Sequence, residues 1–223
     1  MSSFDRAAFT RRNLLTTGLI VAGAAACPAS AQLAVRGVAP VKSPGSDAPD
    51  HSPRAVRPEL FRQAMAALQR HGGRIAHRDR IAIADFAQPS SRPRFHLVDL
   101  ANGATKTFLV AHGSGSDPEH SGWLQRFSNA PNSNASCEGA FLASDYYVGK
   151  HGRSQRLVGL DSTNDNALAR AIVVHSAWYA DEDMIAKHGM LGRSQGCFAV
   201  GEAHLAEVFE RLGPDRMIFS AKV

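Results

Sequence analysis

A potential nucleophile, Cys197, lies in the short segment Ser194-Gln195-Gly196-Cys197. Gly196 permits backbone conformations that other residues avoid and lets two chain segments approach closely. Backbone N–H groups near Gly196 and Cys197 are suited to stabilising the negative oxygen of a tetrahedral intermediate. The segment therefore predicts a thiol nucleophile with an oxyanion hole beside it.

A candidate base, His175, precedes Cys197 by 22 residues and ends the β-branched run Ile172-Val173-Val174. Such a run predicts a buried strand, and residues 180–192 provide a surface excursion that returns the chain beside it. A neighbouring histidine can accept the proton of a thiol and hold its pKa below about 8.5. His175 is therefore a candidate partner for the thiol, although a core histidine is the commoner role of a lone histidine on a strand.

Two further interpretations of these side chains stay open. Cys137 and Cys197 are the cysteines left once Cys27 is removed with an export signal, and such a pair can form a disulfide in an oxidising compartment. His112, Asp117 and His120 could bind zinc, but their glycine-rich loop lacks the spacing of a helical metal site. We favour a loop in which His112 and Gly113 contact substrate or order the wall of a cleft.

The N-terminal segment resembles an export signal. Arg11-Arg12 precedes an apolar run from Leu14 to Ala26, and Ala29-Ser30-Ala31 offers a cleavage site after Ala31. This pattern predicts a twin-arginine signal peptide over residues 1–31 and a periplasmic or secreted protein. The apolar run is shorter than the roughly 20 residues needed to span a bilayer, so no stable membrane span is expected after cleavage.

Composition excludes some partners. The remaining chain carries a net charge of +3, with no block of Lys and Arg interleaved with aromatic residues. Nucleic acid is therefore not expected as a partner. Residues 32–57, which contain Pro40, Pro44, Pro49 and Pro53, predict a flexible linker before a domain over residues 58–223.

The domain is predicted to be mainly β with peripheral helices. An apolar stripe predicts a helix from Pro58 that ends at Gly72-Gly73, and a second long helix covers residues 202–212. A short helix is expected over residues 167–170, capped by Asn164 to Asn166. Alternating or β-branched runs predict strands in the segments RIAIADFA, RFHLVDL, TKTFLVAHG, GAFLASDYYVG, QRLVGL, AIVVHSAWY and RMIFSA, and Asn102-Gly103 predicts a hairpin turn.

Four segments in order resemble the L,D-transpeptidase family of cell-wall enzymes, in particular the murein L,D-transpeptidase catalytic domain proteins. They are HGSGSDPEHSGWLQRFSN, SCEGAFLASDYYVGKHGRSQRLVGLD, NDNALARAIVVH and IVVHSAWY followed by GRSQGC. The resemblance covers roughly residues 78–220. It implies a β-sandwich-like catalytic domain that needs no metal or organic cofactor.

The resemblance also implies roles for residues. Cys197 would attack a peptidoglycan stem tetrapeptide with His175 as base, and the resulting thioester would pass to an amine of a second stem. Positions in the matched segments that are candidates for oxyanion or substrate binding are Gly196, Ser194, Gln195, Ser176, His112, Gly113, Tyr147 and His151.

The chain departs from the family pattern at two of these positions. Gln195 stands where many relatives carry histidine before Gly-Cys, and Ser176 stands where many carry glycine. These differences bear on substrate preference, and three outcomes remain open: transpeptidase, a carboxypeptidase or endopeptidase using water, or a non-catalytic wall-binding module.

Overall fold

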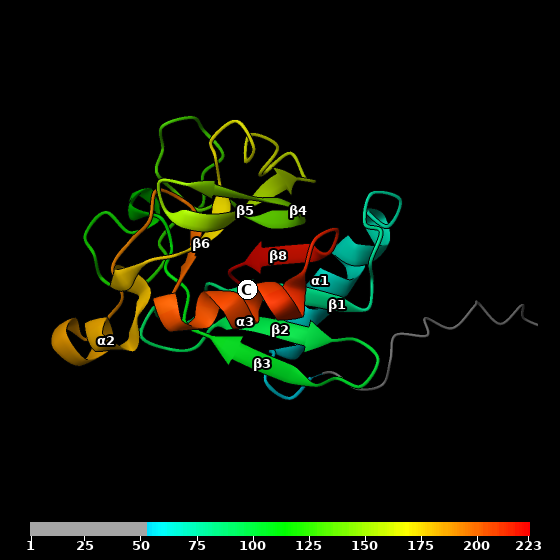
Figure 1. Cartoon of the computed structure of the whole chain (residues 1–223), viewed down its shortest axis with the longest axis horizontal. Helices are drawn as coiled ribbons and strands as arrows, with labels where there is room; N and C mark the ends of the chain where they lie inside the picture. The colour runs from blue at the N-terminus through cyan, green and yellow to red at the C-terminus, as the bar shows by residue number, and fades with distance from the viewer. Residues whose placement is uncertain (1–52) are drawn as a thin grey trace, which may run out of the picture. The chain divides into compact units, whose positions relative to one another are not determined.

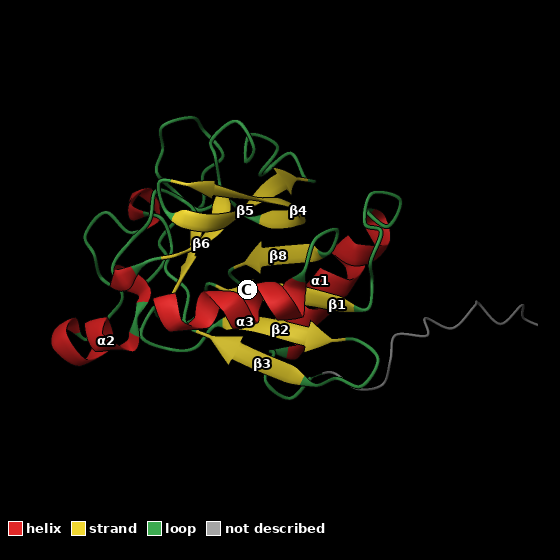
Figure 2. Cartoon of the chain, in the orientation of Figure 1, coloured by secondary structure: helices red, strands yellow, loops and turns green. Residues whose placement is uncertain are grey.

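The structure is a computed structural model that describes residues 53–223. The predicted signal peptide and most of the predicted linker, residues 1–52, lie outside the described residues. The described part contains one eight-stranded sheet with helices against it (Figures 1 and 2). Its longer elements are α1 (Pro58–Arg70), β1 (Arg80–Asp85), β2 (Phe95–Asp99), β3 (Thr105–Phe108), β4 (Gly139–Gly149), β5 (Gly152–Gly159), β6 (Val173–Ser176), α2 (Glu182–His188), β7 (Phe198–Val200), α3 (Leu205–Leu212) and β8 (Met217–Ala221). Three short 3-10 helices cover Ser114–Ser116, Trp178–Ala180 and Glu202–His204.

The sheet runs in the order β3-β2-β1-β8-β4-β5-β6-β7 and curls so that its ends approach each other. Phe95 of β2 and Phe198 of β7 lie near opposite ends of this order, yet their ring centroids are 6.0 Å apart. The backbone N–H of Ala111, just beyond β3, donates to the carbonyl of Ala199 in β7. The curl gives a single sheet the two facing layers of a sandwich, and the mainly β prediction with peripheral helices is confirmed.

Both faces of the central strands are covered by helices, as Figure 2 shows for α1 and α3. Ile81 and Ile83 of β1 pack with the apolar stripe of α1, including Leu60 and Ala64. The alternate residue Ala82 belongs to the larger inner core. Because side chains alternate across a strand, a strand covered on both faces is apolar throughout. In β1, large apolar residues therefore face α1 and small ones face the inner core, in place of an alternation between apolar and polar residues.

The helix α3 packs on the inner face. Leu205, Val208, Phe209 and Leu212 of α3 are buried with the inner side chains of the strands. Gly213 follows with φ of +65°, a conformation that favours glycine, and ends the helix as predicted. The first turn of the predicted helix forms the separate 3-10 turn Glu202–His204.

One local prediction differs from the structure. The helix expected over residues 167–170 is wrong, since residues 162–171 form consecutive turns. Asn164 does not act as a helix cap there: its side chain accepts from the Asp161 N–H and donates to the Ala140 carbonyl, at 3.0 and 2.9 Å. The predicted surface excursion over residues 180–192 is present and contains the helix α2, whose Met184 and Ile185 side chains are partly buried against a small apolar cluster.

The end of the predicted linker packs on the domain. Val56 is buried in the core beside α1, and the Arg57 guanidinium forms a two-pronged ion pair with the buried Asp85 carboxylate. Within residues 53–223, no helix is long and apolar enough to cross a membrane.

Candidate active site

The parallel strands β6 and β7 carry His175 and Cys197 to one face of the sheet. Val174 pairs with Phe198, and both side chains belong to the inner core. Alternation along β6 therefore turns His175 to the opposite face. Cys197 directly precedes β7 and lies two residues before Ala199, the register partner of His175, so its side chain is on that same face. The pair that is 22 residues apart in sequence occupies neighbouring chain segments.

The two side chains line one cavity of about 310 Å³. His175 is almost fully buried at 1% exposure, and Cys197 is half-buried at the cavity wall. The cavity is lined by Tyr147, Lys150, His151, Arg170, Ala171, Val173, His175, Tyr179, Arg193, Ser194, Gln195 and Cys197. A buried imidazole and an accessible thiol thus open into the same small space.

The His175 ring is oriented by its own strand. Its Nδ1 lies 2.8 Å from the Ser176 carbonyl oxygen. A carbonyl oxygen only accepts hydrogen bonds, so Nδ1 must carry the proton and Nε2 is left with the lone pair. A backbone carbonyl therefore orients the imidazole, and the tautomer that it selects leaves Nε2 able to accept a proton.

Burial keeps both groups in their neutral forms. Burial lowers the pKa of His175, against the hydrogen bond to Ser176, and the nearby charges of His151 and Lys150 lower it further. Burial also raises the pKa of the Cys197 thiol, although the Val173 N–H and the charge of Lys150 act in the opposite direction. The thiol donates to the Ala171 carbonyl at 3.6 Å. Burial therefore shifts the pKa of the Cys197 thiol upward, in the direction opposite to the lowering that a neighbouring histidine can produce.

The loop before Cys197 is held by Ser194. Its hydroxyl donates to the Cys197 carbonyl at 2.8 Å and accepts from the Gly196 N–H at 3.1 Å. Gly196 has φ of +110°, and a Cβ there would lie 2.6 Å from the Ala135 carbonyl oxygen and 2.8 Å from the Ile172 side chain. Glycine is required for both reasons, backbone conformation and space. Gln195 is exposed at the cavity mouth.

His112 and Gly113 lie behind this wall and not in the cavity lining. His112 is 1% exposed; its Nδ1 accepts from the Arg94 guanidinium at 2.8 Å, and its Nε2 lies 3.3 Å from the Asp117 carboxylate. Burial and the charge of Arg94 lower the pKa of His112 to about 4. The Ser194 N–H donates to the His112 carbonyl, and the Gly113 N–H donates to the Ser136 hydroxyl, which fastens this loop to the wall that carries Cys197.

The residues weighed as zinc ligands do not converge. His120 Nε2 donates to the Leu191 carbonyl at 3.0 Å, while Asp117 faces His112 and the N–H groups of Ser121 and Gly122. Across residues 53–223, no group of three His, Cys, Asp or Glu side chains is placed to hold a metal ion.

Cys137 and Cys197 are both free thiols. The Cys137 sulfur is buried, donates to the Ser128 carbonyl at 3.4 Å and receives an Arg170 N–H at 2.7 Å. The same guanidinium donates to the carbonyls of Ser128 and Ala135 at 2.8 and 2.6 Å. Arg170 thus links the segment 128–137 to the cavity wall. Asn129, in the same segment, adds hydrogen bonds to Asp165 and Asn166.

The β4–β5 hairpin brings Tyr147 and His151 to the cavity. Tyr147 pairs with Ser154, which pairs with His175, so the three share a face across adjacent strands. His151, at the hairpin turn before Gly152, stacks on the His175 ring with centroids 4.3 Å apart and planes at 21°. The hairpin therefore covers the imidazole that the strand orients.

Lys150, Arg170, Tyr179 and Arg193 line the cavity without having been predicted as site residues. Arg170 carried one signal, since it is the only Lys, Arg, Asp or Glu between Asp165 and Asp181. Lys150 and Arg193 had none, because each stands in a polar loop where a solvated charge is ordinary.

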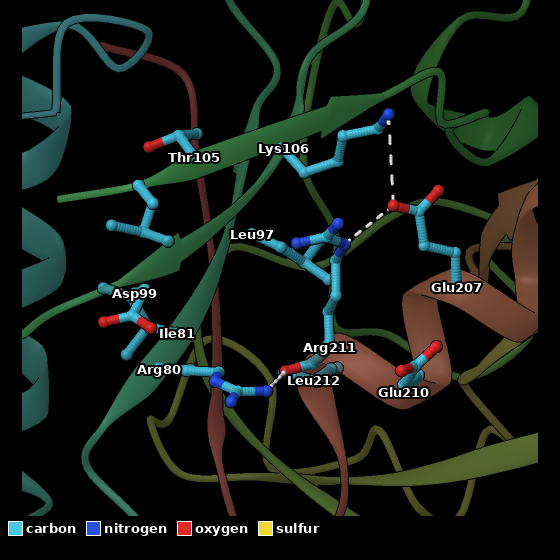
Figure 3. A pocket seen from close by; sticks show the side chains of 12 residues that line it. Arg80, Ile81, Leu97, Asp99, Thr105, Lys106, Glu207, Glu210, Arg211 and Leu212 are labelled. Carbon is cyan, nitrogen blue, oxygen red and sulfur yellow. Dashed lines mark hydrogen bonds and ion pairs between the residues drawn. The ribbon is translucent and has the colours of Figure 1, made fainter. Parts of the chain in front are cut away.

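A second and larger cavity, of about 590 Å³, lies between the β2–β3 hairpin and α3 (Figure 3). Neither a cysteine nor a histidine lines it. In Figure 3, Glu207 bridges two cations: Arg211 at 2.8 Å and Lys106 at 3.9 Å. It contains no nucleophile and base comparable to the pair in the smaller cavity.

The L,D-transpeptidase catalytic domain family matches residues 52–220, most of the chain and all of the elements that form the site. The chain belongs to this family. The resemblance inferred from the four sequence segments is thereby confirmed. No curated protein sequence matches the chain significantly.

Solved L,D-transpeptidase structures are similar at low identity. An L,D-transpeptidase from Mycobacterium tuberculosis H37Rv has 12% identity and a TM-score of 0.41, covering 65% of this chain and 58% of that one. L,D-transpeptidase 3 from Mycobacterium tuberculosis has 11% identity and a TM-score of 0.42, with 65% and 61% covered. An L,D-transpeptidase from Mycobacterium smegmatis has 13% identity and a TM-score of 0.40, with 64% and 58% covered. The chain thus spans about three fifths of the length of these structures.

The two departures from the family pattern fall at different depths of the site. Ser176 is half-buried at the end of β6, and its backbone carbonyl, which any residue would supply, accepts the His175 Nδ1 proton. Gln195 is exposed at the cavity mouth. The substitution at 195 therefore changes the surface that an incoming substrate meets, whereas that at 176 leaves the orienting hydrogen bond in place.

Proposed function

We propose that this L,D-transpeptidase family member is an exported cysteine acyltransferase acting on peptidoglycan stem peptides, with Cys197 as nucleophile and His175 as general base. The observation that carries the proposal is the hydrogen bond from His175 Nδ1 to the Ser176 carbonyl. It leaves Nε2 as a proton acceptor on a ring that lines the same cavity as the Cys197 thiol. A histidine with a purely structural role in the core is not expected to line a cavity together with a thiol.

In the first half-reaction, the Cys197 sulfur attacks the carbonyl carbon that precedes the terminal D-alanine of a stem tetrapeptide. Its proton passes to His175 Nε2 as the S–C bond forms. The pKa of His175 is lowered and that of Cys197 is raised, so the proton moves during attack and not before it. The imidazolium then protonates the departing amine of D-alanine, the C–N bond breaks and a thioester remains.

The negative oxygen of the tetrahedral intermediate needs a hydrogen-bond donor. The Gly196 N–H already donates to the Ser194 hydroxyl. We therefore assign this role to the Cys197 N–H, with Ser194 and Gly196 holding the loop that presents it.

In the second half-reaction, an amine of another stem attacks the thioester carbon. His175 accepts the amine proton and returns a proton to the departing sulfur, which restores the thiol and leaves a new amide bond. Water in place of the amine would make the same site a carboxypeptidase or endopeptidase.

The test is incubation with a muropeptide tetrapeptide, with and without an acceptor amine, followed by mass spectrometry of protein and products. We expect a thioester adduct on the tryptic peptide containing Cys197, release of D-alanine and a crosslinked dimer. Cys197→Ser should lose the adduct and Cys137→Ser should keep it. A tripeptide without dimer would indicate hydrolysis, and absence of any adduct would favour a binding module.

Export is part of this proposal and rests on Arg11, Arg12 and the apolar run that follows them. Fractionation of cells expressing the full chain should recover a shortened protein from the periplasm or medium. Replacing both arginines with lysine should retain the protein inside the cell.

A further inference from the structure

The cavity around Cys197 is lined by positive charge alone. Its lining includes three cationic side chains, Lys150, Arg170 and Arg193, together with His151 and His175. None of its lining residues is an aspartate or a glutamate. A concave site with one sign of charge concentrates ligands of the opposite sign.

These three cations are not neutralised by nearby carboxylates. Among the described residues, none of them takes part in an ion pair. Arg170 donates to two backbone carbonyls and the Cys137 sulfur, and Arg193 donates to the backbone carbonyls of Asp117 and Pro118. Such acceptors satisfy hydrogen bonds but remove no charge.

Two carboxylates in neighbouring segments, those of Asp117 and Asp165, form no ion pair with these cations. The Asp117 carboxylate is fully buried and turned to His112, Ser121 and Gly122, away from the Arg193 contact, which involves only its backbone carbonyl. Asp165 is bound to the Asn129 amide. The positive charge is felt at the reacting groups, since Lys150 lowers the pKa of both Cys197 and His175.

We propose that this cavity selects an acyl donor bearing free carboxylates close to the scissile amide, and discriminates against the same donor with those carboxylates amidated. Lys150 and Arg193 determine this specificity. Arg170 is a positioning residue, because its N–H groups are committed to segment 128–137. The assignment of the ligand as a peptide rests on the proposed function, whereas the selection for negative charge is a property of the cavity.

The cavity's charge can be measured without any peptide, by comparing two alkylating reagents. Iodoacetate is anionic and iodoacetamide is neutral; in each case the Cys197 sulfur forms a bond to the reagent's methylene carbon and iodide leaves. The ratio of the two rates, followed on the tryptic peptide containing Cys197, cancels changes in thiolate fraction, which affect both reagents equally. Local charge effects on association in clefts span about 10-fold to 1,000-fold.

We expect Lys150→Gln and Arg193→Gln each to lower the iodoacetate-to-iodoacetamide ratio about fivefold. Lys106→Gln removes the same charge from β3, in the larger cavity, and should leave the ratio unchanged. High salt should also lower the wild-type ratio, because the Debye length shrinks to about 3 Å at 1 M. A ratio that neither cavity variant changes would overturn the proposal, and the second variant guards against misfolding of the first.

Peptide donors then distinguish this inference from the proposed function. Acylation of Cys197 by a tetrapeptide stem with free carboxylates should be about tenfold faster than by its amidated form, and Lys150→Gln should narrow the difference. If both peptides react equally, charge selection of the donor is refuted while the acyltransferase stands. If neither reacts although the alkylation ratio responds as expected, the cavity selects anions and the peptidoglycan assignment is refuted.

Discussion

Two cavities of the domain, the one around Cys197 and the larger one beside α3, differ in how their charges are balanced. The larger one, between the β2–β3 hairpin and α3, is lined by three cations and three carboxylates, and Glu207 pairs with both Arg211 and Lys106. The smaller one has three cations, no carboxylate and the only thiol–imidazole pair of the described residues that shares a cavity. Size therefore does not identify the reactive site. A cavity that compensates its own charge has little electrostatic attraction left for a ligand, whereas an uncompensated one gains from binding its counter-charge.

The largest test of this comparison removes the base from the smaller cavity. His175→Asn should lower kcat/KM for acylation by about 10²- to 10⁴-fold, because it removes the ring nitrogen proposed to take the thiol proton. Arg211→Gln in the larger cavity should leave it unchanged. The measurement is the rate of adduct formation on Cys197 by intact mass; comparable losses in both variants would contradict the contrast.

A second test adds a methyl group at Gly196, next to the proposed nucleophile Cys197. Gly196→Ala places a Cβ 2.6 Å from the Ala135 carbonyl oxygen, at a φ of +110° that disfavours side chains. We expect loss of acylation and a drop of about 3 kcal/mol in the free energy of unfolding, from backbone strain and collision together. Urea denaturation and the acylation rate give the two readouts.

Gly189→Ala is the matched control, since Gly189 has φ of +76° but a Cβ there meets no atom within 4 Å. It should cost about 1 kcal/mol for backbone conformation alone and leave acylation intact. Equal effects of the two substitutions would mean that the collision beside Cys197 is unimportant.

The third test concerns the buried wall that separates the smaller cavity from the core. Burial lowers the pKa of His112 to about 4 in the folded protein. As pH decreases, the unfolded chain therefore becomes protonated at this residue near pH 6.5, whereas the folded protein becomes protonated only near pH 4. Stability is therefore full above the unfolded pKa and falls as pH decreases from about 6.5 to about 4, by about 3 kcal/mol from this residue.

Urea midpoints at pH 7 and pH 4.5 measure this loss. His112→Gln should be less stable at pH 7 and lose less on acidification than the wild type, whereas His188→Gln, at an exposed position on α2, should follow the wild type. If the free energy of unfolding depends on pH identically in all three proteins, His112 is not the residue whose protonation destabilises the fold.

The sequence was sufficient to predict the periodic elements, whereas the roles assigned to His175 and Cys197 stay predictions. Local sequence alone predicts a buried face in two places: the apolar stripe from Leu60 to Leu68 and the β-branched run before His175. The helix and the strand both lie where they were predicted. The strand β7 has only three residues and was missed, because so short a run has no measurable period. The curl that joins Ala111 to Ala199 depends on pairing between distant segments, which no local pattern encodes.

The electrostatics of the site were harder to predict from the sequence. A neighbouring histidine can lower the pKa of a thiol, but burial raises the pKa of Cys197, and burial is a property of the whole fold. Likewise, Lys150 and Arg193 become a paired feature only when the hairpin and the loop before Cys197 meet at one cavity. His112 was expected beside substrate or ordering the wall, and the fold places it behind the wall with Arg94 and Asp117.

A smaller effect is expected from the stacking of His151 on His175. Burial lowers the pKa of His175 and the positive charge of His151 lowers it further; because a base must be neutral to act, the acid limb of the kcat/KM profile should lie below pH 6.5. His151→Gln removes the repulsion and should move that limb to higher pH, with kcat at the plateau little changed. A profile that does not move, compared with His188→Gln as control, would show that the stacked ring does not influence the base.

The smallest effect tests the compensation within the larger cavity. Glu207→Gln leaves Arg211 and Lys106 without their shared carboxylate, so that the cations lining this cavity outnumber its remaining carboxylates, Asp99 and Glu210. Because the pair is partly exposed, the free energy of unfolding should fall by no more than about 0.5 kcal/mol. The iodoacetate-to-iodoacetamide ratio at Cys197 should be unchanged, since the altered charge lies on α3, outside the lining of the cavity that contains the thiol. A change in that ratio would mean that the overall charge of the domain, and not the local set around Cys197, governs access to the thiol.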